Sequence, residues 1–367
     1  MKQTTLFAAM AAVAATAAIP MTASAATKIV TNTVDGISWQ LLIDTSYNSV
    51  SVGPYWSNPD DSTGWKASDY AYVRAIAQSV SGVGGVLEIP AKYRIDGTDY
   101  DTTVIGNRAF IRCKSISTFV LPLRASTTKV ATCAFYGCTS AKTVVLKGPE
   151  MAGVGETQTY NTLTLAANNW FEMSTGVKRV LVGPNAKMDS STAGRFQFIT
   201  STNVVCLLPS TEANTTWSHV TNLGGKDGTI LRYGLDTEKK SITFSTANAA
   251  ELIAFIDFAP LVKDYLGLDT RLSITNSVAL TEEQTATISS YDYDTLSRVT
   301  FVADDATQYA NTVAAVPGAA TLIADLAKLR GAALTVPDGR KVIVPLPNGG
   351  KYSPGGNGTL RLPREAK

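Results

Sequence analysis

Apolar residues recur with a long repeat between residues 105 and 146. The stretches 105–121 and 130–146 share one pattern, Ala-Phe-x-x-Cys-x-Ser, followed by apolar residues spaced apolar-x-x-apolar-x-apolar. Phe110 and Phe135 mark equivalent positions in the two copies. The last two apolar positions alternate, which predicts a short strand with both side chains on one face. A fixed period of roughly 20–50 residues indicates stacked units, because one unit cannot bury its apolar residues alone.

Two weaker copies follow, and one strand precedes the pair. Residues 170–182 and 196–207 repeat the aromatic position and the apolar strand pattern. About 11 residues are inserted before the third copy, and we expect them within 147–166. A strand with the same alternation is expected at 86–89. Four repeated aromatic residues are expected to lie in register, one above another: Phe110, Phe135, Phe171 and Phe196.

The joint pattern Ile-Gly-x-x-Ala-Phe-x-x-Cys-x-Ser, followed by a strand and Leu-Pro, resembles the leucine-rich repeats of bacterial surface antigens of the BspA-like type. The resemblance covers residues 86–209, about a third of the chain. It implies an α/β, strand-rich leucine-rich repeat solenoid that is short and right-handed. It also implies a non-catalytic role in binding proteins or glycans at a bacterial cell surface, as in adhesion.

Residues 1–25 have the pattern of a secretory signal peptide. Lys2 gives a positive start, Leu6–Ile19 is an apolar run, and Ala23-Ser24-Ala25 is a small-residue cleavage site. The apolar run is too short to span a membrane, which needs about 20 residues. We therefore expect a secreted or cell-surface protein whose mature chain has no transmembrane segment.

The remaining segments do not show the repeat pattern. Residues 27–85 predict a β-rich N-terminal cap, because a stack of repeats needs an end with a polar face. Residues 210–240 contain a glycine-rich stretch and are expected to form a linker. Residues 241–367 predict an α+β domain of unknown type.

Finer signals place elements in these flanking segments. Asp35-Gly36 predicts a turn that leads into a strand, and Asp96-Gly97 predicts the tip of a hairpin. In the C-terminal segment, periodicity predicts strands at 241–244, 272–280, 297–302 and 341–346, and helices at 248–266 and 319–330.

Composition narrows the classes of partner. The chain has 367 residues, a formal net charge of +2, and 45% hydrophobic residues, which is ample for a core. Nucleic acid is not an expected partner, because no concentrated run of Lys and Arg is present to meet phosphates.

The four cysteines leave several states open. Cys113 and Cys138 occupy equivalent repeat positions, where each could be a small buried apolar residue. Neighbouring units are about 5 Å apart, so a bridge between them is sterically possible. Cys133 could also pair with either, while Cys206 is the remaining thiol. We expect no metal site, because one histidine and these spacings do not complete a ligand set.

We find no catalytic constellation. His219 is the only histidine, and no nucleophile motif accompanies it. Neighbouring carboxylates at 60–61, 282–283, 292–294 and 304–305 are expected to be solvated turn residues, because acid–base chemistry needs two carboxyls across a cleft. We therefore expect no enzyme activity and no cofactor.

The strand regions of the repeats supply the candidate binding surface. Side chains that alternate with the buried positions should project outward and offer hydroxyls, amines and aliphatic groups to a protein or glycan. Two alternatives stay open: a secreted hydrolase with its catalytic centre in 241–367, and a purely structural surface component. The candidate binding residues are Ser117, Thr118, Lys142, Thr143, Lys178, Arg179 and Asn203.

Overall fold

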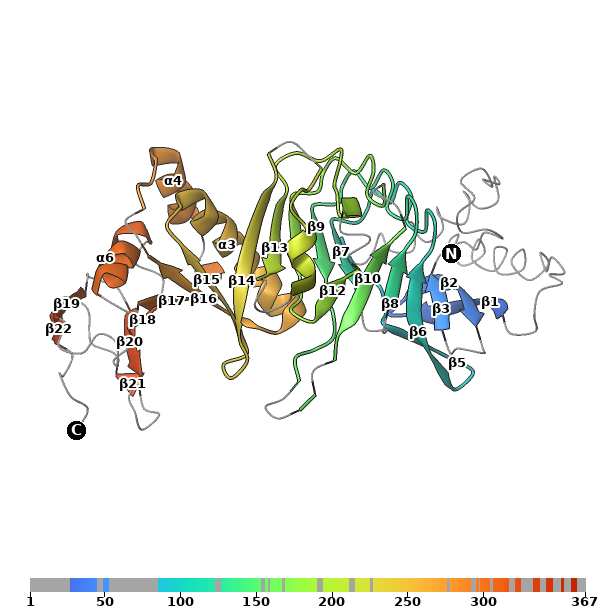
Figure 1. Cartoon of the computed structure of the whole chain (residues 1–367), viewed down its shortest axis with the longest axis horizontal. Coiled ribbons are helices and arrows are strands. Elements are labelled where there is room, and N and C mark those ends of the chain that lie inside the picture. Colours follow the sequence, from blue (N-terminus) through green and yellow to red (C-terminus); the bar gives the residue numbers. More distant parts are fainter. Residues whose placement is uncertain are drawn as a thin grey trace, which may run out of the picture.

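The computed structural model shows a mixed α/β chain that is rich in strands, as the sequence predicts. The N-terminal and C-terminal strands lie at opposite ends of a long molecule (Figure 1). The predicted signal peptide and much of the predicted cap, residues 53–84, lie outside the described residues. The described residues are 27–44, 49–52, 85–122, 127–152, 156–157, 159–166, 169–189, 194–210, 215–224, 227–275, 278–291, 295–296, 298–303, 306–316, 321–324, 333–336, 341–345, 351–352 and 358–361.

Sheet A forms one wall of the repeats. Its described strands follow the order β1-β2-β3-β6-β8-β10-β12, with β5 paired to β6. The strands are β1 (Thr27–Val34), β2 (Ile37–Asp44), β3 (Ser49–Val52), β5 (Lys92–Ile95), β6 (Thr98–Ile105), β8 (Thr127–Val130), β10 (Asn161–Leu165) and β12 (Ala186–Met188).

Sheet B forms the opposite wall and continues into the C-terminal segment. Its order is β21-β20-β18-β17-β16-β15-β14-β13-β11-β9-β7-β4, and β19 (Ala333–Val336) pairs separately with β22 (Gly358–Arg361). The strands of sheet B are β4 (Val86–Glu88), β7 (Thr118–Leu121), β9 (Thr143–Leu146), β11 (Arg179–Val182), β13 (Val205–Pro209), β14 (Thr229–Asp236), β15 (Ser241–Thr246), β16 (Asp269–Ile274), β17 (Val299–Ala303), β18 (Thr321–Ala324), β20 (Lys341–Pro345) and β21 (Lys351–Tyr352).

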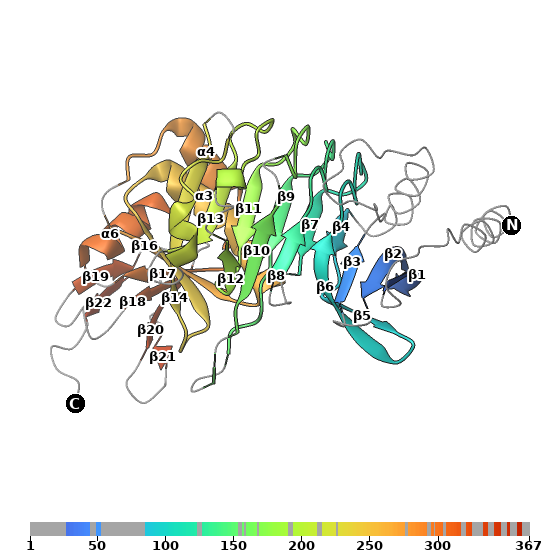
Figure 2. The same cartoon turned by 45° about the vertical axis from the view of Figure 1, so that its right-hand side comes forward.

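From β6 to β13 the chain passes alternately between the two sheets, so each turn adds one strand to each (Figure 2). Neighbouring turns pair in parallel. Thr118, Thr143, Arg179 and Val205 are aligned in successive strands of sheet B, and the step from Thr143 to Arg179 is clearly longer than the steps on either side. The long step contains the connection from β9 to β10, inside the range predicted for the insertion.

A column of phenylalanine rings runs through the core between the sheets. The ring centroids of Phe110 and Phe135 are 5.3 Å apart, and those of Phe135 and Phe171 are 4.5 Å apart, both stacked. Phe198 continues the column, with its centroid 5.6 Å from that of Phe171. Because these rings are at most 1% exposed, the turns share one apolar core, as the repeat spacing predicts.

The fourth ring of the column is not the predicted one. The sequence predicts Phe196 there, but its ring lies 5.8 Å from that of Trp170 and 5.3 Å from that of Trp217, beside the column. The regular repeat spacing from Phe171 leads to Phe196. This turn is two residues longer, so Phe198 takes the place in the column.

The strand register of the fourth turn is also shifted by one residue from the prediction. Cys206 pairs with Val180, and Cys206 and Leu208 belong to the core between the sheets. The sequence pattern places Val205 and Leu207 inward and Cys206 outward. A shift of one residue exchanges the two faces of a strand, so Leu207 faces away from that core.

The repeated cysteine position links neighbouring turns by hydrogen bonds. Cys138 Sγ donates to Phe110 O at 2.9 Å, and Ser174 Oγ donates to Phe135 O at 2.7 Å. Ser201 Oγ donates to Ser174 O at 2.7 Å in the next turn. The position therefore needs a small side chain that can donate to the preceding turn. All four cysteines are free and buried, and burial raises the pKa of each thiol: Cys113, Cys133, Cys138 and Cys206.

Both Asp-Gly pairs form hairpin turns. Asp35 and Gly36 join β1 to β2 with φ values of 52° and 76°, and Asp96 and Gly97 join β5 to β6 with 50° and 82°. Two consecutive positive φ angles are what a two-residue hairpin turn of the favoured type requires. Trp39, 1% exposed, packs with the first turn of the repeats, so the described cap strands share the repeat core.

The segment predicted as a linker instead carries ordered elements. The 3₁₀ helix η3 (Thr215–His219) closes the end of the repeats, with the buried Trp217 Nε1 donating to Ala186 O at 2.5 Å. Strand β14 follows and pairs in parallel with β13 and antiparallel with β15. Glycine content suggested a linker, but the apolar alternation of Leu231 and Tyr233 places a strand there.

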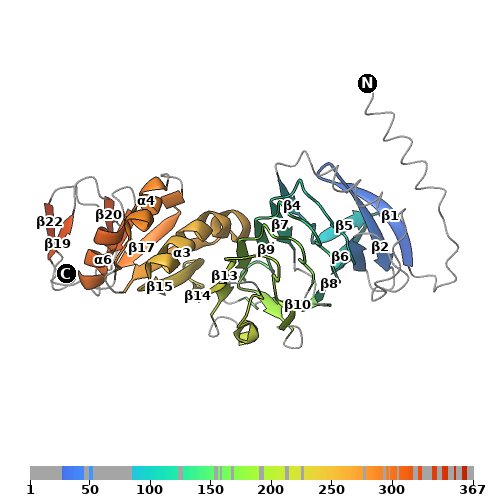
Figure 3. The same ribbon diagram turned by 90° about the horizontal axis from the view of Figure 1, so that it is seen from above.

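The C-terminal segment is an α/β arrangement, not the predicted α+β one. Strands β15 to β18 are parallel, and helices alternate with them, lying on one side of the sheet in Figure 3. The predicted helix at 319–330 is wrong at Thr321–Ala324, where β18 forms. A short apolar run does not by itself distinguish a helix from a strand. The helices are α3 (Ala249–Leu261), the π-helical turn η4 (Val262–Leu266), α4 (Glu282–Ser290) and α6 (Ala306–Ala315).

Candidate binding surface

The outer face of sheet B, where the binding residues were predicted, is covered. Val120, Val145, Leu181 and Leu207 point away from the repeat core, yet each has 0% exposure. They belong to one apolar cluster with Leu252, Phe255 and Ile256 of α3, among others. The C-terminal segment therefore packs over this face of the repeats.

Three of the predicted binding residues are buried or half-buried and are not part of the candidate surface. Thr143 is 1% exposed. Arg179 is half-buried, and its Nη1 donates to the backbone carbonyl of Asp257 in α3 at 3.4 Å. Thr118 is half-buried at the start of β7. The prediction of a free strand face is corrected here, because sequence alternation shows which side chains point outward and not what packs on them.

The other four predicted residues lie at an edge, where each turn leads into its strand of sheet B. Lys142, Lys178 and Asn203 are exposed, while Ser117 is half-buried and its Oγ donates to Gly85 O at 2.9 Å. Backbone hydrogen bonds stack the row: Lys142 N donates to Ser117 O at 2.7 Å, and Lys178 N to Lys142 O at 2.9 Å.

We call this surface the turn edge, and define it as the exposed and half-buried residues of 106–117, 131–142, 169–178 and 196–203. Its first three turns contain five basic residues and one acidic residue, Glu172, although the whole chain has a net charge of only +2. Basic charge is therefore concentrated on this edge. Four of the five are exposed, Arg112, Lys114, Lys142 and Lys178, and Arg108 is half-buried.

Backbone geometry presents long side chains from the turn edge. Arg112, Gly137 and Met173 occupy equivalent positions, each two residues after a column phenylalanine, with φ values of 52°, 69° and 58°. A non-glycine residue in this left-handed region costs about 1–2 kcal/mol. Gly137 makes room for its neighbour, since a Cβ there would lie 3.1 Å from Arg112 Cγ. The two other turns retain long side chains at this position despite the cost.

Two large apolar side chains are exposed beside the basic residues. Met173 is 48% exposed and Ile199 is 43% exposed. Both belong to the turn edge, in its third and fourth turns. The surface thus combines long cationic side chains with exposed apolar groups, a composition that protein partners contact through desolvated anchors and a charged rim.

Sequence reasoning missed Arg112, Lys114, Met173 and Ile199 as part of this surface. The strand positions drew attention because their alternation is easy to read. The repeat itself held part of the missing signal, because in three of the turns one residue between the column phenylalanine and the small Cys or Ser position is exposed: Arg112, Met173 and Ile199.

The structure places three of the residues that the sequence analysis considered for chemistry, His219, Glu282 and Glu283. His219 is exposed at the end of η3. Glu282 and Glu283 lie in the first turn of α4, which Thr281 caps, a favourable place for carboxylates. The other carboxylate pairs, at 60–61, 292–294 and 304–305, lie outside the described residues.

Within the described segments, no three His, Cys, Asp or Glu side chains gather to hold a metal ion, and no helix is long and apolar enough to cross a membrane.

Comparison with known proteins finds little similarity. No protein-family model matches the sequence, and no curated protein matches it significantly. A solved structure, a leucine-rich repeat protein from Bacteroides ovatus, matches 88% of this chain and 67% of its own, with 10% sequence identity and a TM-score of 0.20. A score of this size does not establish a shared fold.

Proposed function

We propose that this chain is an exported, non-catalytic leucine-rich repeat solenoid of the BspA-like type that binds an acidic partner protein at or outside the cell surface. The parallel turns and their shared phenylalanine column support the repeat class. The signal-peptide pattern at residues 1–25 supports export. The surface that meets the partner in this proposal is the turn edge.

One observation carries the choice of surface: the turn edge is basic and exposed, whereas the outer strand face is buried under the C-terminal segment. A surface with five basic residues and one acidic residue favours an acidic partner by charge complementarity. Exposed Met173 and Ile199 favour a protein over a purely polar glycan, since apolar side chains need apolar contact to contribute to affinity.

The test is a binding screen of the chain from residue 26, run against extracellular-matrix proteins and against acidic glycans. The variant Arg112→Glu/Lys114→Glu/Lys142→Glu reverses charge on the turn edge. We expect at least a tenfold loss of affinity for the captured protein, and a weakening of wild-type binding as salt is raised.

The matched control reverses three cations elsewhere, at Lys92, Lys129 and Lys239, which lie on other parts of the molecule. Equal losses in the two triple variants would indicate a net-charge effect and contradict the proposed surface. Capture of acidic glycans only, with no protein bound, would contradict the choice of partner.

A further inference from the structure

A pocket of about 350 Å³ lies between the repeats and the C-terminal segment, away from the turn edge. One wall is Lys147–Met151, the start of the long connection from β9 to β10. The other is Asp264–Leu268, at the end of η4, and Lys240 and Pro184 complete the lining. The volume is at the small end of ligand pockets.

The insertion wall distinguishes this turn from its neighbours. The step from β9 to β11 is longer than the step before it, from β7 to β9, and the step after it, from β11 to β13. Insertions in single repeats map to loops that often form the binding face. Asn185 Nδ2 holds the start of this insertion by donating to Pro149 O and Glu150 O, both at 3.0 Å.

The opposite wall has an uncommon backbone conformation. Pro260 lies inside α3 and cannot donate to the helical ladder, and a π-helical turn, Val262–Leu266, follows it. Turns of π-helix are rare in proteins, and those that occur are frequently found at functional sites. Gly267, with φ 67°, ends the turn.

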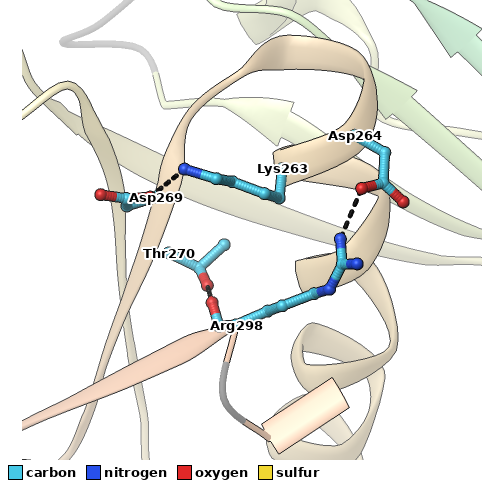
Figure 4. A network of polar contacts seen from close by, with 5 residues as sticks. All are labelled: Lys263, Asp264, Asp269, Thr270 and Arg298. Atoms are coloured by element: carbon cyan, nitrogen blue, oxygen red, sulfur yellow. Dashed lines mark hydrogen bonds and ion pairs between the residues drawn. The ribbon is translucent and has the colours of Figure 1, made fainter. Parts of the chain in front are cut away.

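Ion pairs fix this wall to the strands behind it (Figure 4). Lys263 Nζ lies 2.7 Å from Asp269 Oδ1, and Arg298 Nη1 lies 2.5 Å from Asp264 Oδ1. Thr270 Oγ1 also donates to the backbone carbonyl of Arg298. The wall is therefore held at Asp264 and at the preceding residue, Lys263, which favours a preformed pocket.

Four charged residues line the pocket: the cations Lys147 and Lys240 and the carboxylates Glu150 and Asp264. Lys147 is paired with Glu88 at 2.8 Å, and Asp264 is paired with Arg298. Lys240 makes no ion pair with a described residue. An exposed ammonium at the rim of a pocket is suited to a carboxylate.

Tyr265 adds an aromatic ring and a hydroxyl to the lining. A tyrosine hydroxyl is protonated at neutral pH at its ordinary pKa and can donate a hydrogen bond. Burial, with the nearby carboxylates of Asp264 and Glu88, raises this pKa further. Met151 and Leu266 supply apolar surface beside the ring. A ring face, a donor and a cation together suit a sugar ring that carries an acid group.

We propose that this pocket binds a sugar acid the size of a monosaccharide, with its carboxylate on Lys240 and its ring against Tyr265. The proposal stands apart from the turn edge, so either site can fail without the other.

The test is a titration by calorimetry of the chain from residue 26 with galacturonate, galactose and acetate. We expect galacturonate to bind in roughly the millimolar range, as a small ligand with few contacts should, and the other two to bind at least fivefold more weakly. The variant Lys240→Gln should weaken galacturonate binding at least tenfold. The control Lys239→Gln changes the preceding lysine, which is paired with Asp236 and does not line the pocket, and should leave binding unchanged.

Three results would overturn the proposal. Galacturonate binding that stays undetectable when the ligand is in large excess over the protein, or that survives Lys240→Gln, removes the assigned site. Acetate as tight as galacturonate would indicate a simple anion site. Galactose as tight as galacturonate would remove the role of the carboxylate.

Discussion

The two sheets of the repeats have outer faces of opposite character. Sheet B presents Val120, Val145, Leu181 and Leu207, all fully buried against the C-terminal segment. The outer face of sheet A presents polar side chains that stay half-exposed, and no described helix lies over β8 and β10 in Figure 2. These polar side chains are Lys129, Thr162, Thr164 and Lys187.

The difference in apolar character determines which face is covered by the rest of the chain. An apolar outward row in a parallel sheet needs a cover, since a large exposed apolar patch on a monomer is uncommon. Helix α3 and the turn η4 provide that cover within the same chain. In our proposal the partner therefore meets the basic turn edge, and not the covered strand face of sheet B.

The largest expected effect follows from removing the cover. A chain that ends at Lys240 lacks α3 and exposes the apolar row of sheet B. We expect it to aggregate or to fail to fold, measured by size-exclusion chromatography and circular dichroism. A soluble monomer with cooperative unfolding would contradict the role of the C-terminal segment as a cover.

A single substitution on each face makes the comparison quantitative. Leu181→Ala removes a fully buried side chain and should lower the free energy of unfolding by about 2–5 kcal/mol. Thr162→Ala, on the half-exposed face of sheet A, should change it by less than about 1 kcal/mol. Urea denaturation measures both, and similar losses would remove the distinction between the faces.

A smaller effect is expected from the ion pair that anchors the cover. Arg298→Ala breaks the contact with Asp264, whose side chain is 53% exposed, and should cost about 0.2–1 kcal/mol, since solvent screens exposed pairs. The loss should shrink in high salt when measured by thermal unfolding. A loss of several kcal/mol would contradict the assignment of this contact as a solvent-screened pair.

The smallest change in stability is expected from making sheet A resemble sheet B. The double variant Thr162→Val/Thr164→Val should alter the free energy of unfolding by about 1 kcal/mol or less, because valine suits a strand. Its solubility should fall, since the new apolar row has no cover. Unchanged solubility in a precipitation assay would indicate that this face is already covered.

The sequence predicts the repeated turns well because their signal is local and regular. The spacing of Phe110 and Phe135 gives the column, and the position of the long insertion agrees with the structure. The prediction fails in the fourth turn. An extra two residues move Phe198 into the column. A shortening after it leaves the strand shifted by only one residue, so Cys206 points inward. A repeat count cannot detect such compensating shifts.

The candidate surface was harder to predict, because it depends on contacts between distant segments. Thr143 was chosen for its outward position, yet it is 1% exposed, and its neighbour on the same face, Val145, packs in one cluster with α3, more than a hundred positions away. The apolar character of Val120, Val145 and Leu181 did hold a signal that this face has a cover. The turn edge, by contrast, could have been found from the positions of its basic residues.

Cysteine accessibility tests the central claim most directly, because the four native thiols are buried. Val145→Cys places a thiol on the outer face of sheet B, Thr162→Cys on that of sheet A, and Lys142→Cys on the turn edge. We predict rapid maleimide labelling of the folded protein at 142 and 162, and labelling at 145 only as fast as global unfolding. Rapid labelling at 145 under native conditions would contradict the account.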